Sequence, residues 1–193
     1  PAVLRALARR LESLPALREL TFVDSDVWSQ DTEAWDPAPA ATVRLPALTA
    51  MTVRVARDAP LAFELPALRS LEAWEFRPWM RACGAGGLRS LSLSVVSPDH
   101  PAITRPGGGC CFPQLRVLKI KNGFDGMSLR PRSLLDVADN CRHLEEIDAW
   151  VGACPGLLRA FLLSAPPSLR SCKLVASTSD DQGQRSAWHV ACF

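Results

Sequence analysis

Apolar residues recur along the chain in a short phrase rather than in long runs. Each copy has a leucine, two variable residues, an apolar residue, one variable residue and usually a second apolar residue, and a proline or small residue commonly precedes it. Pro15–Phe22 and Pro66–Ala73 are clear copies. The anchoring leucines are separated by 20 to 31 residues. They are Leu17, Leu48, Leu68, Leu88, Leu115, Leu144 and Leu169. Such self-similarity predicts an array of stacked units.

The spacing inside the phrase predicts one short strand per unit. Its last two apolar positions lie two apart, so both side chains point to one face of a strand. A single strand cannot bury that face, whereas stacked copies in a parallel sheet share one core. Parallel strands also need a returning segment. We expect an extended or 3₁₀ return in the Pro-rich stretch 54–66, and a helix over 133–141 with Ser133 as its N-cap.

The phrase resembles the leucine-rich repeat, whose unit has about 20–29 residues built on LxxLxL, over residues 11–176. Residues 138–147 resemble the cysteine-containing subtype, in which a helix ends in xxCxxLxxL. That subtype is common in F-box proteins, which select substrates for cullin–RING ubiquitin ligases. The resemblance implies an α/β fold, a leucine-rich-repeat solenoid with a short-stranded parallel sheet on its concave side. Helical, 3₁₀ or extended returns would form the convex side.

Two stretches interrupt the repeat, and a third follows it. We expect residues 1–176 to form about seven irregular repeats, with long loops near 23–44 and 97–111, and residues 177–193 to form a C-terminal cap or a flexible tail. The first loop carries Trp28 and Trp35 among five acidic residues. Insertions of this kind often bind partners, so both tryptophans are candidate protein-binding residues.

Composition and net charge limit the classes of protein to which the chain can belong. The chain has 193 residues, of which 48% are hydrophobic and 22% charged, which argues against disorder. A net charge of +2 predicts no nucleic-acid partner. Every apolar run is shorter than the roughly 18–20 residues that a membrane span needs, so none is expected. Seven cysteines are an odd number and too few for a small disulfide scaffold, which indicates a reducing, intracellular compartment, cytoplasmic or nuclear.

Catalytic chemistry finds little support in the sequence. Three histidines are scattered over the chain, and no Cys–His or Ser–His–Asp set can be argued from them. His189 and Cys192 have HxxC spacing, but no second pair completes a zinc site. We therefore expect no catalytic, cofactor-binding or metal-binding residues, no cofactor and no enzymatic activity.

Variable residues that flank the buried strand positions would face the concave surface of such an array. They form two rows, one in the middle of each phrase and one two residues further on, and the second row runs from Val23 to Val175. Solvent-facing tryptophan and mixed charge are typical of protein-binding surfaces. The candidate contact residues on this face are Thr21, Thr52, Arg54, Glu72, Trp74, Ser92, Lys119, Lys121, Asp148, Trp150 and Lys173.

These observations predict a non-catalytic protein–protein interaction module. The resemblance implies a finer role, the substrate-recognition part of an F-box ubiquitin-ligase adaptor, with ligase subunits and a substrate as partners. An F-box would be expected upstream, as an LPxE phrase that heads three helices. Two alternatives stay open. One is a structural or assembly subunit of a large complex, which irregular repeats and six tryptophans would suit. The other is the sensing repeats of an immune receptor.

Overall fold

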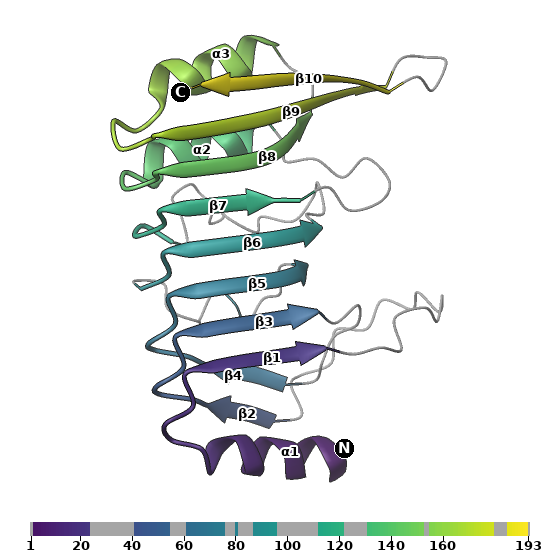
Figure 1. Ribbon diagram of the computed structural model, residues 1–193, viewed down its shortest axis with the longest axis vertical. Coiled ribbons are helices and arrows are strands. Elements are labelled where there is room, and N and C mark those ends of the chain that lie inside the picture. The colour runs from purple at the N-terminus through teal and green to yellow at the C-terminus, as the bar shows by residue number, and fades with distance from the viewer. Residues whose placement is uncertain are drawn as a thin grey trace.

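An α/β architecture with a mostly parallel sheet and few helices is seen in the computed structural model (Figure 1). The structure describes residues 2–23, 41–54, 61–75, 80, 87–95, 112–121, 131–152, 155–179 and 185–192. Eight strands form the main sheet, in the order β1-β3-β5-β6-β7-β8-β9-β10. They are β1 (Glu19–Val23), β3 (Ala50–Arg54), β5 (Ser70–Glu75), β6 (Ser90–Val95), β7 (Val117–Ile120), β8 (Glu146–Gly152), β9 (Ser171–Ser179) and β10 (Arg185–Cys192). All pairings are parallel except that of β10 with β9.

The connecting segments change character along the molecule. Near the N-terminus, β2 (Ala41–Arg44) and β4 (Leu61–Glu64) form a separate parallel pair. Further along, α2 (Pro131–Asn140) and α3 (Pro155–Ser164) pack against each other. In Figure 1 the β2–β4 pair and α2 lie behind the main sheet, α1 (Ala2–Glu12) lies at the β1 end and α3 at the β10 end. The front of the main sheet is crossed by no described helix or strand.

One tight turn precedes the strand in six of the repeats. In each, the anchoring leucine donates its N–H to the carbonyl of the residue three positions before it, at 2.9–3.3 Å. Five of these turns carry proline at their second position, where its fixed φ suits the turn: Pro15, Pro46, Pro66, Pro113 and Pro167. The exception is Cys141–Leu144, where Arg142 takes that place. The cysteine phrase and the Leu-Pro-Ala-Leu phrase are therefore two versions of the same turn.

The first residue of the turn packs into the core in the later turns, whereas Leu14 of the first turn is 39% exposed. Leu45, Leu65, Phe112 and Cys141 are each 2% exposed or less. The Cys141 thiol also donates to the Phe112 carbonyl, the equivalent turn position of the preceding repeat, with Sγ and O 3.8 Å apart. The first side chain of the Cys141 turn thus contacts the preceding repeat. The backbone N–H of the last turn residue, the anchoring leucine, holds the turn closed.

A backbone ladder then ties each turn to the next. The carbonyl of the residue after each anchoring leucine accepts two N–H groups, from the corresponding residue of the next repeat and from the residue after that, at 2.7–3.1 Å. The Arg69 carbonyl, for example, accepts from Arg89 and Ser90. A carbonyl oxygen has two lone pairs, so one oxygen satisfies two donors. This ladder sets the register with which each strand begins.

The core lies between the main sheet and its returns. Inward residues of neighbouring strands face one another in register, as Leu71, Leu91 and Leu118 do. The inner leucines of the turns complete the core, and those from Leu48 to Leu144 are at most 1% exposed. Val137 of α2 and Phe161 of α3 are fully buried in the same cluster. No polar or charged side chain is buried among the described residues.

Several sequence-based expectations can be compared with these elements. The extended return within 54–66 is confirmed by β4, and the helix over 133–141 is confirmed by α2. Ser133 is not its N-cap, because α2 already begins at Pro131, whose fixed φ suits a first helical turn. The expectation of a loop over all of 23–44 is wrong at its end, because residues 41–44 form β2, paired in register with β4.

Other expectations concern the loops and the tail. Residues 24–40 and 96–111, which hold most of the two expected loops, lie outside the described residues. Residues 185–192, expected to belong to a cap or a flexible tail, form β10, which pairs with β9 in an antiparallel hairpin. Neither α1 nor α3 was expected from the sequence.

The Arg142→Pro substitution tests the shared turn. Proline should suit Arg142 because five equivalent positions already carry it and no described bond uses the Arg142 N–H. We expect the free energy of unfolding to rise by about 0.4–1 kcal/mol, because proline restricts the unfolded chain. Urea unfolding followed by circular dichroism measures it, with Arg142→Ala as the near-neutral control. A destabilised Arg142→Pro variant would contradict a common turn geometry.

Candidate protein-binding surface

The outer face of the main sheet, on the side away from the core, carries the first predicted row. Thr21, Thr52, Glu72, Ser92, Lys119, Asp148 and Lys173 are direct neighbours across seven parallel strands. Their side chains are exposed or partly exposed. The structure therefore brings residues separated by up to 152 positions into one continuous line. Strand periodicity alone placed them, because alternate residues of a strand face the same side.

The second row lies two residues further along the strands. It contains Arg54, Trp74, Lys121 and Trp150, all exposed or partly exposed. Trp74 on β5 and Trp150 on β8 are separated by three strand steps, about 14 Å at the usual spacing of ~4.8 Å. Trp28 and Trp35, the expected loop contacts, lie outside the described residues.

One member of the second row does not reach solvent. Val175 on β9 was expected to face outward, but its side chain is only 2% exposed. Its partners on the two adjacent strands are Trp150 and His189. The outer face is therefore accessible over its central strands, but it is covered at Val175 of β9.

Ion pairs cross the outer face between strands. Glu72 Oε1 lies 3.3 Å from Arg54 Nη2 and 3.4 Å from Lys121 Nζ. The Lys121 pair spans β6, where the small side chains of Ser92 and Ser94 leave room above the backbone. Asp148 Oδ2 lies 3.4 Å from Lys173 Nζ. The charges of this surface therefore neutralise one another locally instead of building a field of one sign.

Lys119 has the one pKa in the described region that clearly departs from its ordinary value. Its Nζ lies 2.9 Å from Glu146 Oε1. The hydrogen bond to Glu146 and the charge of that carboxylate raise the pKa of Lys119 above 10.5; burial opposes this rise, and the charge of Asp148 adds to it. The pair thus stabilises the folded state below pH 10.5, and this contribution is lost as the pH rises through the raised pKa.

Glu146 belongs to a third row that sequence reasoning missed. This row lies two residues before the first, at the start of the strands, and contains Glu19, Ala50, Ser70, Ser90, Val117, Glu146 and Ser171. The same alternation that located the other rows extends to these positions, so the signal was present in the sequence. The outer face is three residues deep rather than two.

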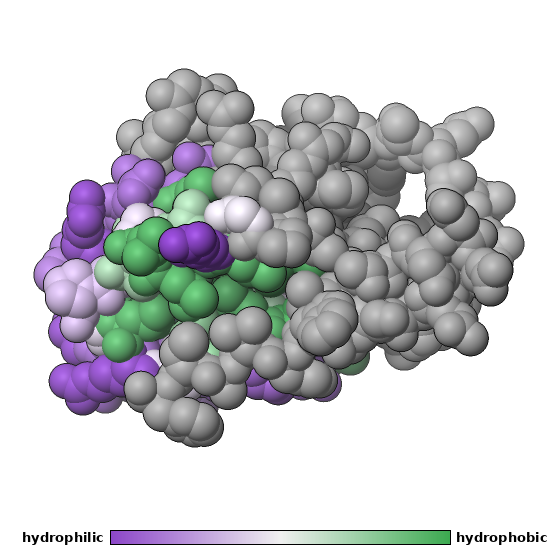
Figure 2. All heavy atoms as spheres, turned by 90° about the horizontal axis from the view of Figure 1, so that it is seen from above, coloured by the Kyte–Doolittle hydropathy of each residue, from purple (hydrophilic) through white to green (hydrophobic). Residues whose placement is uncertain are grey.

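A second exposed surface of different chemistry lies on α3. Leu163 is 80% exposed and Leu162 39% exposed. Figure 2 views the molecule from the α3 end and shows apolar side chains gathered there. The outer face combines charge pairs with tryptophan, whereas this end is aliphatic.

No group of three or more His, Cys, Asp or Glu side chains that could hold a metal ion occurs in the described part of the chain. Cys141 and Cys172 are both buried. No helix within the described ranges has the length and apolar character needed to cross a membrane.

Comparisons with known protein families, with curated proteins and with solved structures found no match to this chain.

Substitution of Glu146 tests the electrostatics of this face. In Glu146→Gln the side-chain pKa of Lys119 should fall toward 10.5, because the lysine loses both its charged acceptor and the nearby negative charge. Glu145→Gln is the matched control, since Glu145 pairs with Arg116 instead, at 2.9 Å. Lysine side-chain NMR over a pH titration measures both. An unchanged Lys119 pKa in Glu146→Gln would refute the pairing.

Proposed function

We propose that the chain is a protein-interaction module built as a leucine-rich-repeat array, and that the outer face of its main sheet binds a protein partner. The observation that carries the proposal is the alignment of polar, charged and tryptophan side chains across seven parallel strands that no described element covers. The repeating turn, the parallel register and the changing returns support the repeat array.

Trp74 and Trp150 are the expected anchors of this contact. Tryptophan is enriched among the residues that dominate binding energy, because its large ring buries much area at low entropic cost. Both rings are partly exposed, so a partner has apolar surface left to cover. The strip between them carries Ser94 and Lys121, the latter paired with Glu72. A partner side chain would lie on this strip between the two indoles.

The ion pairs of the outer face suit exchange with a partner. Exposed pairs such as Arg54–Glu72 contribute about 0–1 kcal/mol each, so redirecting them toward a partner costs little. Opposite charges at known positions then select a partner by complementarity and exclude partners that would place like charges together. We propose that the tryptophans supply most of the affinity and the charge pairs most of the selectivity.

The resemblance to F-box repeats extends the proposal to a substrate-recognition role in a cullin–RING ubiquitin ligase. The turn formed by Cys141–Leu144, directly after α2, supports this extension, because it has the helix–Cys–x–x–Leu order of the cysteine-containing repeat. In such an adaptor the outer face would hold the substrate.

Affinity purification of the tagged protein from its own cells, with mass spectrometry, tests both the proposed binding at the outer face and the proposed adaptor role. Trp74→Thr/Trp150→Thr should lower the recovery of the specific partner by about tenfold or more, because each truncated hot-spot tryptophan costs roughly 2 kcal/mol or more. Threonine keeps the strand propensity. Leu162→Gln/Leu163→Gln is the matched control, which removes exposed apolar side chains from α3.

The outcomes distinguish the proposed binding at the outer face from the proposed adaptor role. A partner lost in the tryptophan variant and kept in the control supports the outer face, whereas the reverse pattern places the interface on α3 and overturns it. Near-stoichiometric cullin–RING subunits would support the adaptor role. A large, fixed set of unrelated subunits would replace that role with a structural one.

A further inference from the structure

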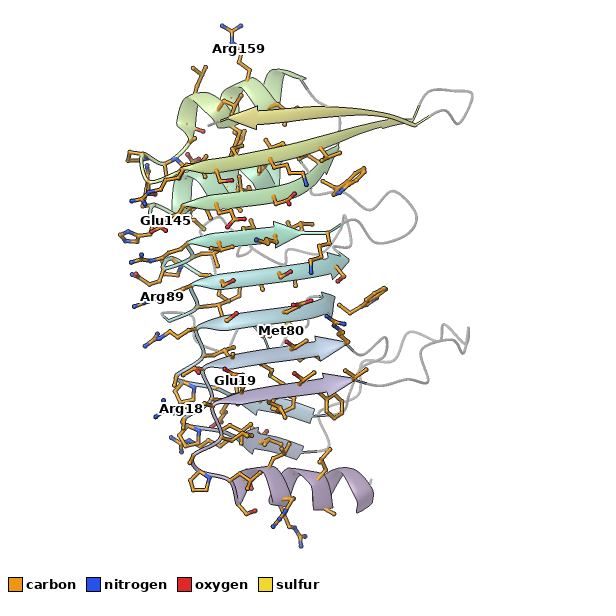
Figure 3. The ribbon with its side chains drawn as sticks, in the orientation of Figure 1. Arg18, Glu19, Met80, Arg89, Glu145 and Arg159 are labelled. Carbon is orange, nitrogen blue, oxygen red and sulfur yellow. The ribbon has the colours of Figure 1, made fainter. Side chains whose placement is uncertain are left out.

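The residue after each anchoring leucine lies where a strand of the main sheet begins. Because each of these residues bonds through its backbone to the next, they form one line across the molecule, called here the arginine column. Its members are Arg18, Thr49, Arg69, Arg89, Arg116, Glu145 and Arg170. Figure 3 shows Arg18, Arg89 and Glu145 along this edge. The column is distinct from the outer face, whose three rows lie within the strands.

Five of the seven side chains are arginines, and all five are exposed. Arg116 pairs with Glu145, with Nη1 and Oε1 2.9 Å apart, and Arg69 donates to the Gly87 carbonyl at 3.0 Å. No carboxylate in the described part of the chain lies within ion-pairing distance of Arg18, Arg89 or Arg170. With a net charge of only +2 for the whole chain, the column is a local concentration of positive charge.

We propose that the arginine column binds an acidic, extended segment of another protein. Six strand steps of ~4.8 Å make the column about 29 Å long, the reach of roughly nine residues of extended chain. Guanidinium groups match carboxylates with two parallel hydrogen bonds, which favours Asp and Glu as their ligands. This contact goes beyond the outer-face function, because it uses a different edge of the sheet and a different chemistry.

Two features favour an acidic protein segment over a nucleic acid. Glu145 interrupts the column and Glu19 follows Arg18 directly (Figure 3), so a continuous phosphate backbone would meet like charge at both places. A peptide can place neutral residues opposite them. The described residues of the column and its turns also include no exposed Trp, Phe or Tyr on which bases could stack.

Fluorescence anisotropy with a labelled peptide of alternating Glu and Ser tests the proposal. The peptide is about 12 residues long, enough to span the column, and the buffer holds about 50 mM NaCl so that screening is modest. Arg18→Gln/Arg89→Gln/Arg170→Gln removes the three arginines that have no described partner. Arg9→Gln/Arg44→Gln/Arg159→Gln is the control, because it removes the same charge from exposed positions on α1, β2 and α3.

The column variant should bind the peptide about tenfold more weakly, as expected for the loss of three exposed ion pairs, while the control stays within about twofold of the wild type. Equal weakening by both variants would reduce the effect to net charge and overturn the proposal. Tighter, column-dependent binding of a single-stranded oligonucleotide of similar length would also overturn it. Trp74→Thr/Trp150→Thr should bind the peptide normally, so failure of the outer-face function leaves this test intact.

Discussion

The structure depends on one carbonyl oxygen per repeat, that of the residue after the anchoring leucine. By accepting two N–H groups of the next repeat, it fixes where the following strand starts. A slip of one residue would turn every inward side chain of a strand to the outer face. In the turns that begin at Leu45, Leu65, Phe112 and Cys141, the anchoring leucine and the first turn residue are both buried in the same core, which holds this oxygen in place.

Both candidate surfaces follow from that constraint. Once the strands start in register, variable residues of separate repeats become neighbours, and charges such as Lys121 and Glu72 meet although they lie far apart in the chain. The same ladder aligns the arginines at the strand starts. The turn and the backbone ladder recur from repeat to repeat, so the chemistry of each surface depends on exposed side chains that lie outside the core. Such surfaces can diverge without disturbing the core.

The features that could be predicted from the sequence are those that recur in each copy of the phrase or that follow a local periodicity. The anchoring leucines and the two outward rows could be predicted because the repeated phrase and the two-residue alternation of a strand are local signals. The helix α2 could be predicted because residues 134–141 form an apolar stripe at helical spacing. The backbone ladder between repeats could not be predicted, because it joins residues far apart in the chain. The N–H of Arg89, for example, donates to a carbonyl 20 residues earlier. α1 and α3 were missed because they stand outside the repeated phrase, and α3 is apolar on several sides rather than on one stripe. Val175 was misplaced because strand alternation shows which face a side chain lies on but not how far that face is covered.

Hydrogen exchange at the amides of the ladder tests the central claim most directly. The N–H groups of Arg69, Arg89 and Arg116 each donate to a carbonyl of the preceding repeat at 2.8 Å, although their side chains are exposed. We expect these amides to exchange as slowly as those of the central strands β5 to β7, because they can open only when neighbouring repeats separate. Exchange as fast as that of unprotected turn amides would contradict the account, since the strands would then need another source of register.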